Sequence, residues 1–286
     1  MNKDRIKLIT AMLLFGTIGL VRRYIPYSSA LTACARALIG AVLLGAVILL
    51  RRKRVDWGAV KKQALRLSVS GVLLGINWIL LFEAYRRTTV AVATVCYYMA
   101  PVCVIAVSPW ILRERVPLRK WLCVLAALAG VALTAGVQPE GTLGAAGVLY
   151  GLAAAVLYAA VVLLNKKITG LAALERTMMQ LAAAALTLLP YVCLTQDVTA
   201  LTWEVKGVLW LLVAGAVHTA LAYALYFGSM ERLSAQSVAL ISYIDPVTAV
   251  LLSALLLREP LPWPAAVGAV LVLCAALLGE LPAREK

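Results

Sequence analysis

The sequence predicts an all-α integral membrane protein, with ten transmembrane helices arranged as two inverted repeats of five helices. Hydrophobic residues make up 63% of the 286 residues and charged residues only 14%, whereas soluble domains are nearer one half apolar and one quarter charged. The apolar residues form continuous runs of about 20 residues and do not alternate as in barrel strands. The two halves of the chain also resemble each other at a fixed offset. This composition excludes an ordinary soluble enzyme, a disordered chain and a nucleic-acid-binding module.

Ten apolar segments follow one another, and the connections between them are too short for a soluble domain. At a rise of about 1.5 Å per residue, each segment can cross a hydrocarbon core of about 30 Å with modest tilt or local thinning. The first segment is not expected to be a cleaved signal peptide, because Arg22 and Arg23 follow it and no small-residue cleavage site does. The predicted spans are residues 6–21, 29–50, 64–84, 88–110, 121–137, 143–164, 173–194, 207–228, 234–257 and 264–281.

The distribution of basic residues predicts that both termini are cytoplasmic. With this orientation, 20 of the 27 Lys and Arg residues lie inside, 6 lie outside, and Arg36 lies within a span. Because cytoplasmic connections of membrane proteins are rich in Lys and Arg, the net charge of +14 indicates topology and not a nucleic-acid partner. All seven tryptophans except Trp78 fall near span ends, where an aromatic belt is expected.

An internal repeat relates residues 1–137 to residues 143–286 at an offset of 145 positions. Each half holds five predicted spans, and an odd number places the second half upside down in the membrane. Inverted repeats of this kind are typical of secondary transporters that alternate access around a midplane site. The coinciding residues are Phe82 and Phe227, Tyr98 and Tyr243, Pro101 and Pro246, Leu-Arg-Glu at 112–114 and 257–259, and Pro117 and Pro262.

These motifs resemble those of the ten-span EamA-type members of the drug/metabolite transporter superfamily. The resemblance covers essentially the whole chain and is carried by FEAYRRTTVAVATVCYYMAP at 82–101, AYALYFGSM at 222–230 and LREPLP at 257–262. Arg36 matches a position that is often basic in that family. The resemblance implies a multi-pass transporter of the plasma or inner membrane. It leaves the substrate open among amino acids, nucleotide sugars, cations and other metabolites.

Four ionisable residues lie within the predicted spans, where each costs at least about 2.5–3.5 kcal/mol to insert. Asp245 is interpreted as a substrate or proton site, or else as a partner of backbone freed by Pro246. His218, the only histidine, is a second candidate for proton coupling, and its pairing with Asp245 is left open. Arg36 and Glu83 are interpreted either as a structural ion pair or as substrate-binding groups.

Aromatic residues near the middle of the spans are candidates for the wall of a substrate cavity. Trp78 and Tyr223 coincide under the repeat offset. Symmetry-related aromatic side chains could grip an organic cation or a ring, although helix packing is an equal alternative for about half of them. The predicted set is Asn77, Trp78, Tyr97, Tyr98, Tyr158, Tyr223 and Tyr243.

Pro101 and Pro246 interrupt the fourth and ninth predicted spans at matching positions. A proline removes an amide donor and kinks a helix, so the pair is expected to form hinges or to shape the cavity. No nucleotide-binding loop, zinc-protease or serine-hydrolase motif is present, and a catalytic function is not expected. The six cysteines show no ligand spacing, so neither a metal nor a cofactor is expected.

The function expected from these residues is secondary transport of a small polar metabolite, with proton coupling as a further hypothesis. Two carboxylates, one arginine and several aromatics favour an amino acid, an amine or a related zwitterion or cation. The alternatives are a facilitative exchanger of an anionic or nucleotide-type metabolite, a lipid-related flippase and a passive channel. The lipid bilayer is a necessary partner, and a homodimer is left open.

Overall fold

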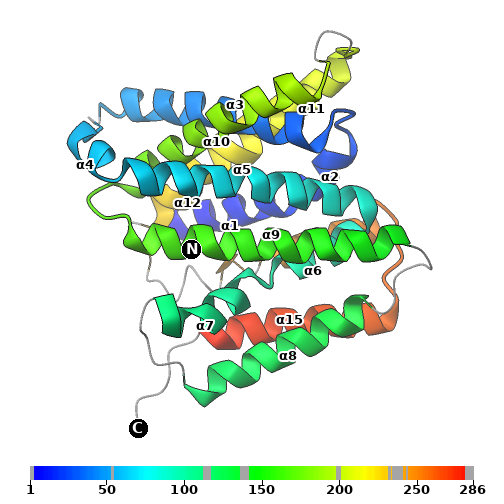
Figure 1. Ribbon diagram of the computed structural model, residues 1–286. Coiled ribbons are helices and arrows are strands. Elements are labelled where there is room, and N and C mark those ends of the chain that lie inside the picture. Colours follow the sequence, from blue (N-terminus) through cyan, green and yellow to red (C-terminus); the bar gives the residue numbers. More distant parts are fainter. Residues whose placement is uncertain are drawn as a thin grey trace.

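Each of the ten apolar segments contains helix in the computed structural model of the chain (Figure 1). The structure describes residues 3–52, 55–111, 117–135, 142–197, 201–230, 233, 241–242 and 244–280, and these contain no β-strand. The helices are α1 Lys3–Gly16, α2 Ile18–Arg23, α3 Ser29–Leu50, α4 Trp57–Lys62, α5 Ala64–Arg87, α6 Val90–Tyr97, α7 Ala100–Ile111, α8 Leu118–Ala135, α9 Thr142–Lys167, α10 Ala173–Thr195, α11 Val205–Gly215, the π-helical η1 Ala216–Leu221, α12 Ala222–Met230, α14 Ile244–Leu255 and α15 Trp263–Glu280.

Six of these helical stretches are long and apolar enough to cross a membrane. The apolar parts of α8, α14 and α15 are shorter. Many large apolar side chains point outward, and Leu50 and Leu194 are 84% and 87% exposed. Since a soluble fold buries most such side chains, this surface fits a multi-pass membrane protein surrounded by lipid. The six stretches are 29–50, 64–87, 90–107, 144–167, 173–195 and 205–227.

Two of the predicted spans are interrupted within the described residues. The first breaks at Thr17, between α1 and α2, and the fourth breaks at Tyr98 and Met99, between α6 and α7. Pro101 is the second residue of α7, a position where the missing N–H would have no helical partner in any case. Pro101 therefore begins a helix and does not bend one in its middle. Pro246 is the third described residue of α14, and residues 241–242 are also helical, so its role as a hinge stays a prediction.

Serine and threonine side chains cap the buried helix starts. The Leu31 N–H donates to the Ser28 hydroxyl at 3.1 Å at the start of α3, and the Val92 N–H donates to the Thr89 hydroxyl at 3.2 Å at the start of α6. Such caps satisfy amides that no carbonyl of the same helix can reach. They matter more in a bilayer, where water cannot replace the missing acceptor.

Most of the closest helix contacts join the first half of the chain to the second. α3 packs on α10, and α8 packs on α15, a pair that lies together at one edge of the molecule (Figure 1). α5 packs on α9 and α10, α1 packs on α12 and α14, α9 packs on α6 and α7, and α3 packs on α11 and η1.

Glycines allow two of these pairs to approach closely. A Cβ atom on Gly71 of α5 would lie 2.5 Å from the Gln180 carbonyl oxygen of α10. One on Gly130 of α8 would lie 2.7 Å from the Gly268 carbonyl oxygen of α15. Small residues at helix contacts are the usual means of tight packing in membranes, because apolar burial alone does not drive helices together there.

Candidate functional site

Arg36 lies in the interior of the bundle, only 5% exposed, where α3 faces η1. Its Nε donates to the Thr219 hydroxyl at 2.7 Å and its Nη2 to the His218 carbonyl oxygen at 3.4 Å. The guanidinium also stands 4.1 Å from the centroid of the Trp78 ring. None of the ion pairs among the described residues includes Arg36. A buried cation held by neutral groups alone is expensive, which favours a functional role over a structural one.

The π-helical turn η1 provides the oxygen atoms that hold Arg36. The Thr219 hydroxyl donates to the Ala214 carbonyl at 3.0 Å, and His218 Nδ1 lies 3.2 Å from the Val213 carbonyl oxygen. His218 Nε2 lies 2.8 Å from the hydroxyl of Thr17, at the break in the first span. Turns of this kind occur often at functional sites. The sequence did not predict the π-helical turn. Residues 207–228 are apolar throughout, and a turn that is wider by one residue does not change that pattern.

Asp245 and the tyrosines form a layer beside this arginine. The Tyr98 hydroxyl donates to Asp245 Oδ2 at 2.7 Å. The Tyr97 ring lies 6.4 Å from the Tyr98 ring and 5.4 Å from the Tyr158 ring, between centroids. Tyr158 and Tyr223 also interact electrostatically with Asp245. Asp245, Tyr97, Tyr98 and Tyr223 are half-buried and Tyr158 is 36% exposed, so the surrounding helices do not fully enclose this layer.

Asn77 and Trp78 form the buried side of the same layer. The Asn77 Nδ2 donates to the Ala154 carbonyl oxygen at 2.5 Å, and the Tyr97 hydroxyl donates to Asn77 Oδ1 at 3.4 Å. Trp78 is 3% exposed and packs against Arg36. We call Arg36, Asn77, Trp78, Tyr97, Tyr98, Tyr158, Tyr223 and Asp245 the central cluster. It contains eight of the predicted residues.

The described residues do not form either of the two pairings that the sequence left open. His218 contacts Thr17 and the Val213 carbonyl, not Asp245. Glu83 lies apart from Arg36, because Ser29, which donates to Glu83 at 2.6 Å, is seven residues and about 10 Å along α3 from Arg36.

Glu83 belongs to a separate ionic group at the end of α5. It pairs with Arg86 at 2.9 Å and with Arg87 at 3.3 Å. These arginines follow at the three- and four-residue spacings that bring helix side chains together. For two other predicted residues the side chain is not described: Tyr243 lies outside the described residues, and for Pro101 only the backbone is described.

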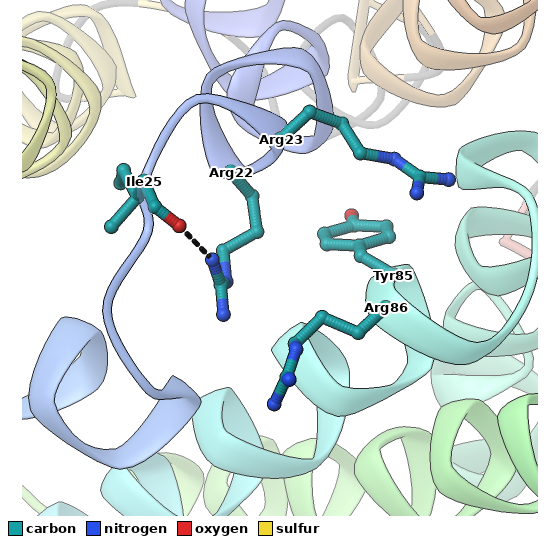
Figure 2. A pocket seen from close by; sticks show the side chains of 5 residues that line it. All are labelled: Arg22, Arg23, Ile25, Tyr85 and Arg86. Atoms are coloured by element: carbon teal, nitrogen blue, oxygen red, sulfur yellow. Dashed lines mark hydrogen bonds between the residues drawn. The ribbon is translucent and has the colours of Figure 1, made fainter. Parts of the chain in front are cut away.

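A cavity of about 260 Å³ opens between α2 and the end of α5. Figure 2 shows Arg22 and Arg23 on one side, Tyr85 and Arg86 on the other, and Ile25 at the rim. We call it the arginine cavity. The sequence did not predict this cavity, because arginines at the ends of two spans do not by themselves indicate that the fold brings them together.

Arg22 is the most buried of these arginines, at 4% exposed. Its guanidinium donates to the Ile25 carbonyl at 2.8 Å, to the Tyr27 carbonyl at 3.1 Å and to the Ser29 hydroxyl at 3.3 Å, but its Nε has no partner. Burial, and then repulsion from Arg86, lowers the pKa of Arg22 to about 10. The group therefore stays protonated at neutral pH.

Phe82 lies near both the arginine cavity and the central cluster. Its ring is fully buried, and the guanidinium carbons of Arg22 and Arg36 each lie 5.8 Å from the ring centroid. The two buried arginines thus share one aromatic neighbour. Among the described residues, no group of three or more His, Cys, Asp or Glu side chains could hold a metal ion.

Comparison with known proteins identifies the family and the fold of this chain. A model of the EamA-like transporter family matches residues 6–136 and again residues 145–279. A solved crystal structure of a protein with 19% sequence identity superposes with a TM-score of 0.66 over 97% of this chain and 96% of its own, and so shares the fold.

Curated relatives agree with the family match. The uncharacterized transporter YxxF of Bacillus subtilis is 27% identical over 86% of this chain and 79% of its own length. Protein PecM of Dickeya dadantii is 28% identical over 92% of this chain and 86% of its own. These matches indicate a transporter rather than an enzyme, with a small-molecule substrate and a lipid bilayer as its partners. The chain is a multi-pass membrane protein that belongs to the EamA-like transporter family.

Proposed function

We propose that the protein is a secondary active transporter that moves a small polar metabolite by alternating access through the central cluster. The single observation that carries the proposal is the placement of Arg36 and Asp245. Both lie in one aromatic layer inside the bundle, and neither joins an ion pair among the described residues. A substrate with complementary polar groups would offset the burial of these two charges.

Ten membrane crossings in two inverted repeats, residues 1–137 and 143–286, are part of this proposal. The double match of the family model supports the division. Helix packing supports it too, because the offset of 145 exchanges α1 with α9, α3 with α10, α5 with α11 to α12, α6 and α7 with α14, and α8 with α15. The contact of α5 with α9 then corresponds to that of α12 with α1, and the contact of α9 with α6 and α7 corresponds to that of α1 with α14.

We propose further that both termini are cytoplasmic and that the protein lies in the plasma or inner membrane. The excess of basic residues on one set of connections supports this orientation. With it, the arginine cavity opens to the outside.

The substrate class that the central cluster favours is an amino acid, an amine or a related zwitterion. The Asp245 carboxylate would accept hydrogen bonds from an ammonium group, and the tyrosines around it would attract the same cation through their ring faces. Arg36 would take the carboxylate of a zwitterion.

Proton coupling at Asp245 and His218 is proposed as the driving force. Asp245 is half-buried in the central cluster. His218, which lies on η1, is within hydrogen-bond distance of the Thr17 hydroxyl at the break between α1 and α2. A proton on either group would change hydrogen bonds that join helices. The helix breaks at Thr17 and before Pro101, together with Pro246, would supply the hinges.

Facilitative exchange of an anionic metabolite is the second candidate function. The observation that favours it is the arginine cavity, whose lining carries positive charge without a lining carboxylate. Counterflow that needs no proton gradient would separate exchange from proton-coupled transport.

Thermal stability against a metabolite library tests the proposal. A ligand of the native state raises the unfolding temperature by mass action, so the purified protein would be screened at two pH values on either side of neutrality. We expect zwitterionic or cationic hits that Asp245→Asn loses. Asp56→Asn is the matched control, because Asp56 only caps α4 by accepting from the Ala59 N–H at 3.0 Å and asparagine caps equally well. Hits that survive Asp245→Asn unchanged would contradict the assigned site.

A further inference from the structure

The arginine cavity carries more positive charge than its surroundings neutralise. Arg23 pairs with Glu259, and Glu83 is shared between Arg86 and Arg87. Arg22 joins no ion pair among the described residues, so the three guanidinium groups that line the cavity share two carboxylates, one of which also pairs with Arg87 outside the lining. Such an excess on the wall of a cavity attracts anions.

The buried donor of Arg22 points to the same kind of ligand. Three carbonyl or hydroxyl oxygens satisfy the other nitrogens of this guanidinium, whereas the buried Nε has no acceptor. Buried N–H groups without partners are rare in proteins, because each one costs the desolvation of a polar group. An anionic oxygen in the cavity would satisfy it.

We propose that the arginine cavity is a binding site for the carboxylate or phosphate group of a small anionic ligand. The planar guanidinium forks of Arg22, Arg23 and Arg86 surround the cavity from two elements, as Figure 2 shows, and their geometry matches the oxygens of carboxylate and phosphate. The volume of about 260 Å³ suits a small metabolite or the charged end of a larger one.

Phe82 gives this site a place on the substrate path, an assignment that rests on the proposed transport function. The ring is in contact range of both Arg22 and Arg36, at 5.8 Å from each guanidinium carbon. An anionic group held in the arginine cavity would need only to pass Phe82 to reach the next buried guanidinium. The arginine cavity would then be the entrance station, and the central cluster the transport site.

Anion-dependent thermal stability tests the binding site without any transport. The full chain would be placed in phosphatidylcholine nanodiscs and titrated with inorganic phosphate and with acetate, each against chloride at equal ionic strength. We expect phosphate or acetate to raise the unfolding temperature of the wild type, and Arg86→Gln to weaken this binding about tenfold.

Arg87→Gln is the matched control, because Arg87 also pairs with Glu83 but does not line the cavity. It should bind the anion like the wild type. A second set of discs, with phosphatidylglycerol and no added anion, identifies the source. Stabilisation by this lipid that Arg86→Gln abolishes assigns the site to a lipid phosphate. Absence of stabilisation in both sets, or equal effects of Arg86→Gln and Arg87→Gln, overturns the proposal.

The two proposals can fail separately. Anion binding without any transport activity would leave the arginine cavity standing and remove the proposed function. Transport by a protein whose stability does not respond to anions would do the reverse.

Discussion

Replacing Glu259 should loosen one end of the bundle, because this carboxylate joins three helices. It accepts the Val90 N–H at 2.7 Å at the start of α6 and the Ser253 hydroxyl at 2.5 Å from α14, and it pairs with Arg23 of α2. Val90 is only 1% exposed, so Glu259→Ala leaves a buried amide without an acceptor, at about 1–3 kcal/mol. The pair with Arg23, whose side chain is 37% exposed, adds about 1 kcal/mol or less.

The expected total is about 1–4 kcal/mol for Glu259→Ala, which corresponds to a fall in Tm of roughly 2–16 °C. Glu259→Gln is the informative control, since its amide oxygen still accepts the Val90 N–H and only the ion pair is lost. We expect it to lower the free energy of unfolding by about 1 kcal/mol or less. Thermal unfolding of the two variants in the same detergent measures the difference. Equal losses in both would refute the assignment of the main effect to the buried amide.

Three further predictions follow from the helix contacts and the central cluster. Tyr98→Phe removes the 2.7 Å hydrogen bond to Asp245 and should weaken substrate binding roughly tenfold or more, measured by the ligand-dependent rise in Tm, whereas unchanged binding would separate Tyr98 from the site. Gly71→Ala should destabilise the protein by about 1–3 kcal/mol, while Gly45→Ala, whose new Cβ would meet its nearest atom at 3.4 Å, should stay within about 0.5 kcal/mol in the same thermal assay. Trp78→Leu should cost about 2 kcal/mol or more through the lost arginine–ring contact, with Trp78→Phe recovering part of it, and equal losses in both variants would exclude that contact as the cause.

Helix positions could be predicted from the sequence because bilayer-length apolar runs leave the chain few alternatives. Helix α3 begins and ends at the predicted residues, 29 and 50. The interruptions could not be predicted in the same way. The break at Thr17 and the π-helical turn depend on contacts between residues 201 positions apart, such as that of Thr17 with His218.

The sequence could name individual candidate residues, but it could not name the groups that contact them. A charge within an apolar run signals a functional candidate from its burial cost alone, so Arg36 and Asp245 could be named. Their partners depend on depth and on the face of the helix, which is why the sequence left the pairings with Glu83 and His218 open and did not indicate Thr219 and Tyr98.

The arginine cavity could not be predicted for a related reason. Arginines at the ends of spans do not by themselves indicate a site, and only the fold shows that Arg22 is buried and close to Arg86.

Counterflow in proteoliposomes tests the central claim most directly. Liposomes with the wild type, Asp245→Asn or Asp56→Asn would be loaded with the ligand found by thermal screening, and uptake of labelled ligand would be followed without an ion gradient. Alternating access through the central cluster predicts saturable uptake that internal ligand accelerates, a large loss in Asp245→Asn and wild-type behaviour in Asp56→Asn. Uptake that rises linearly with concentration and ignores internal ligand, or that Asp245→Asn leaves unchanged, would contradict it.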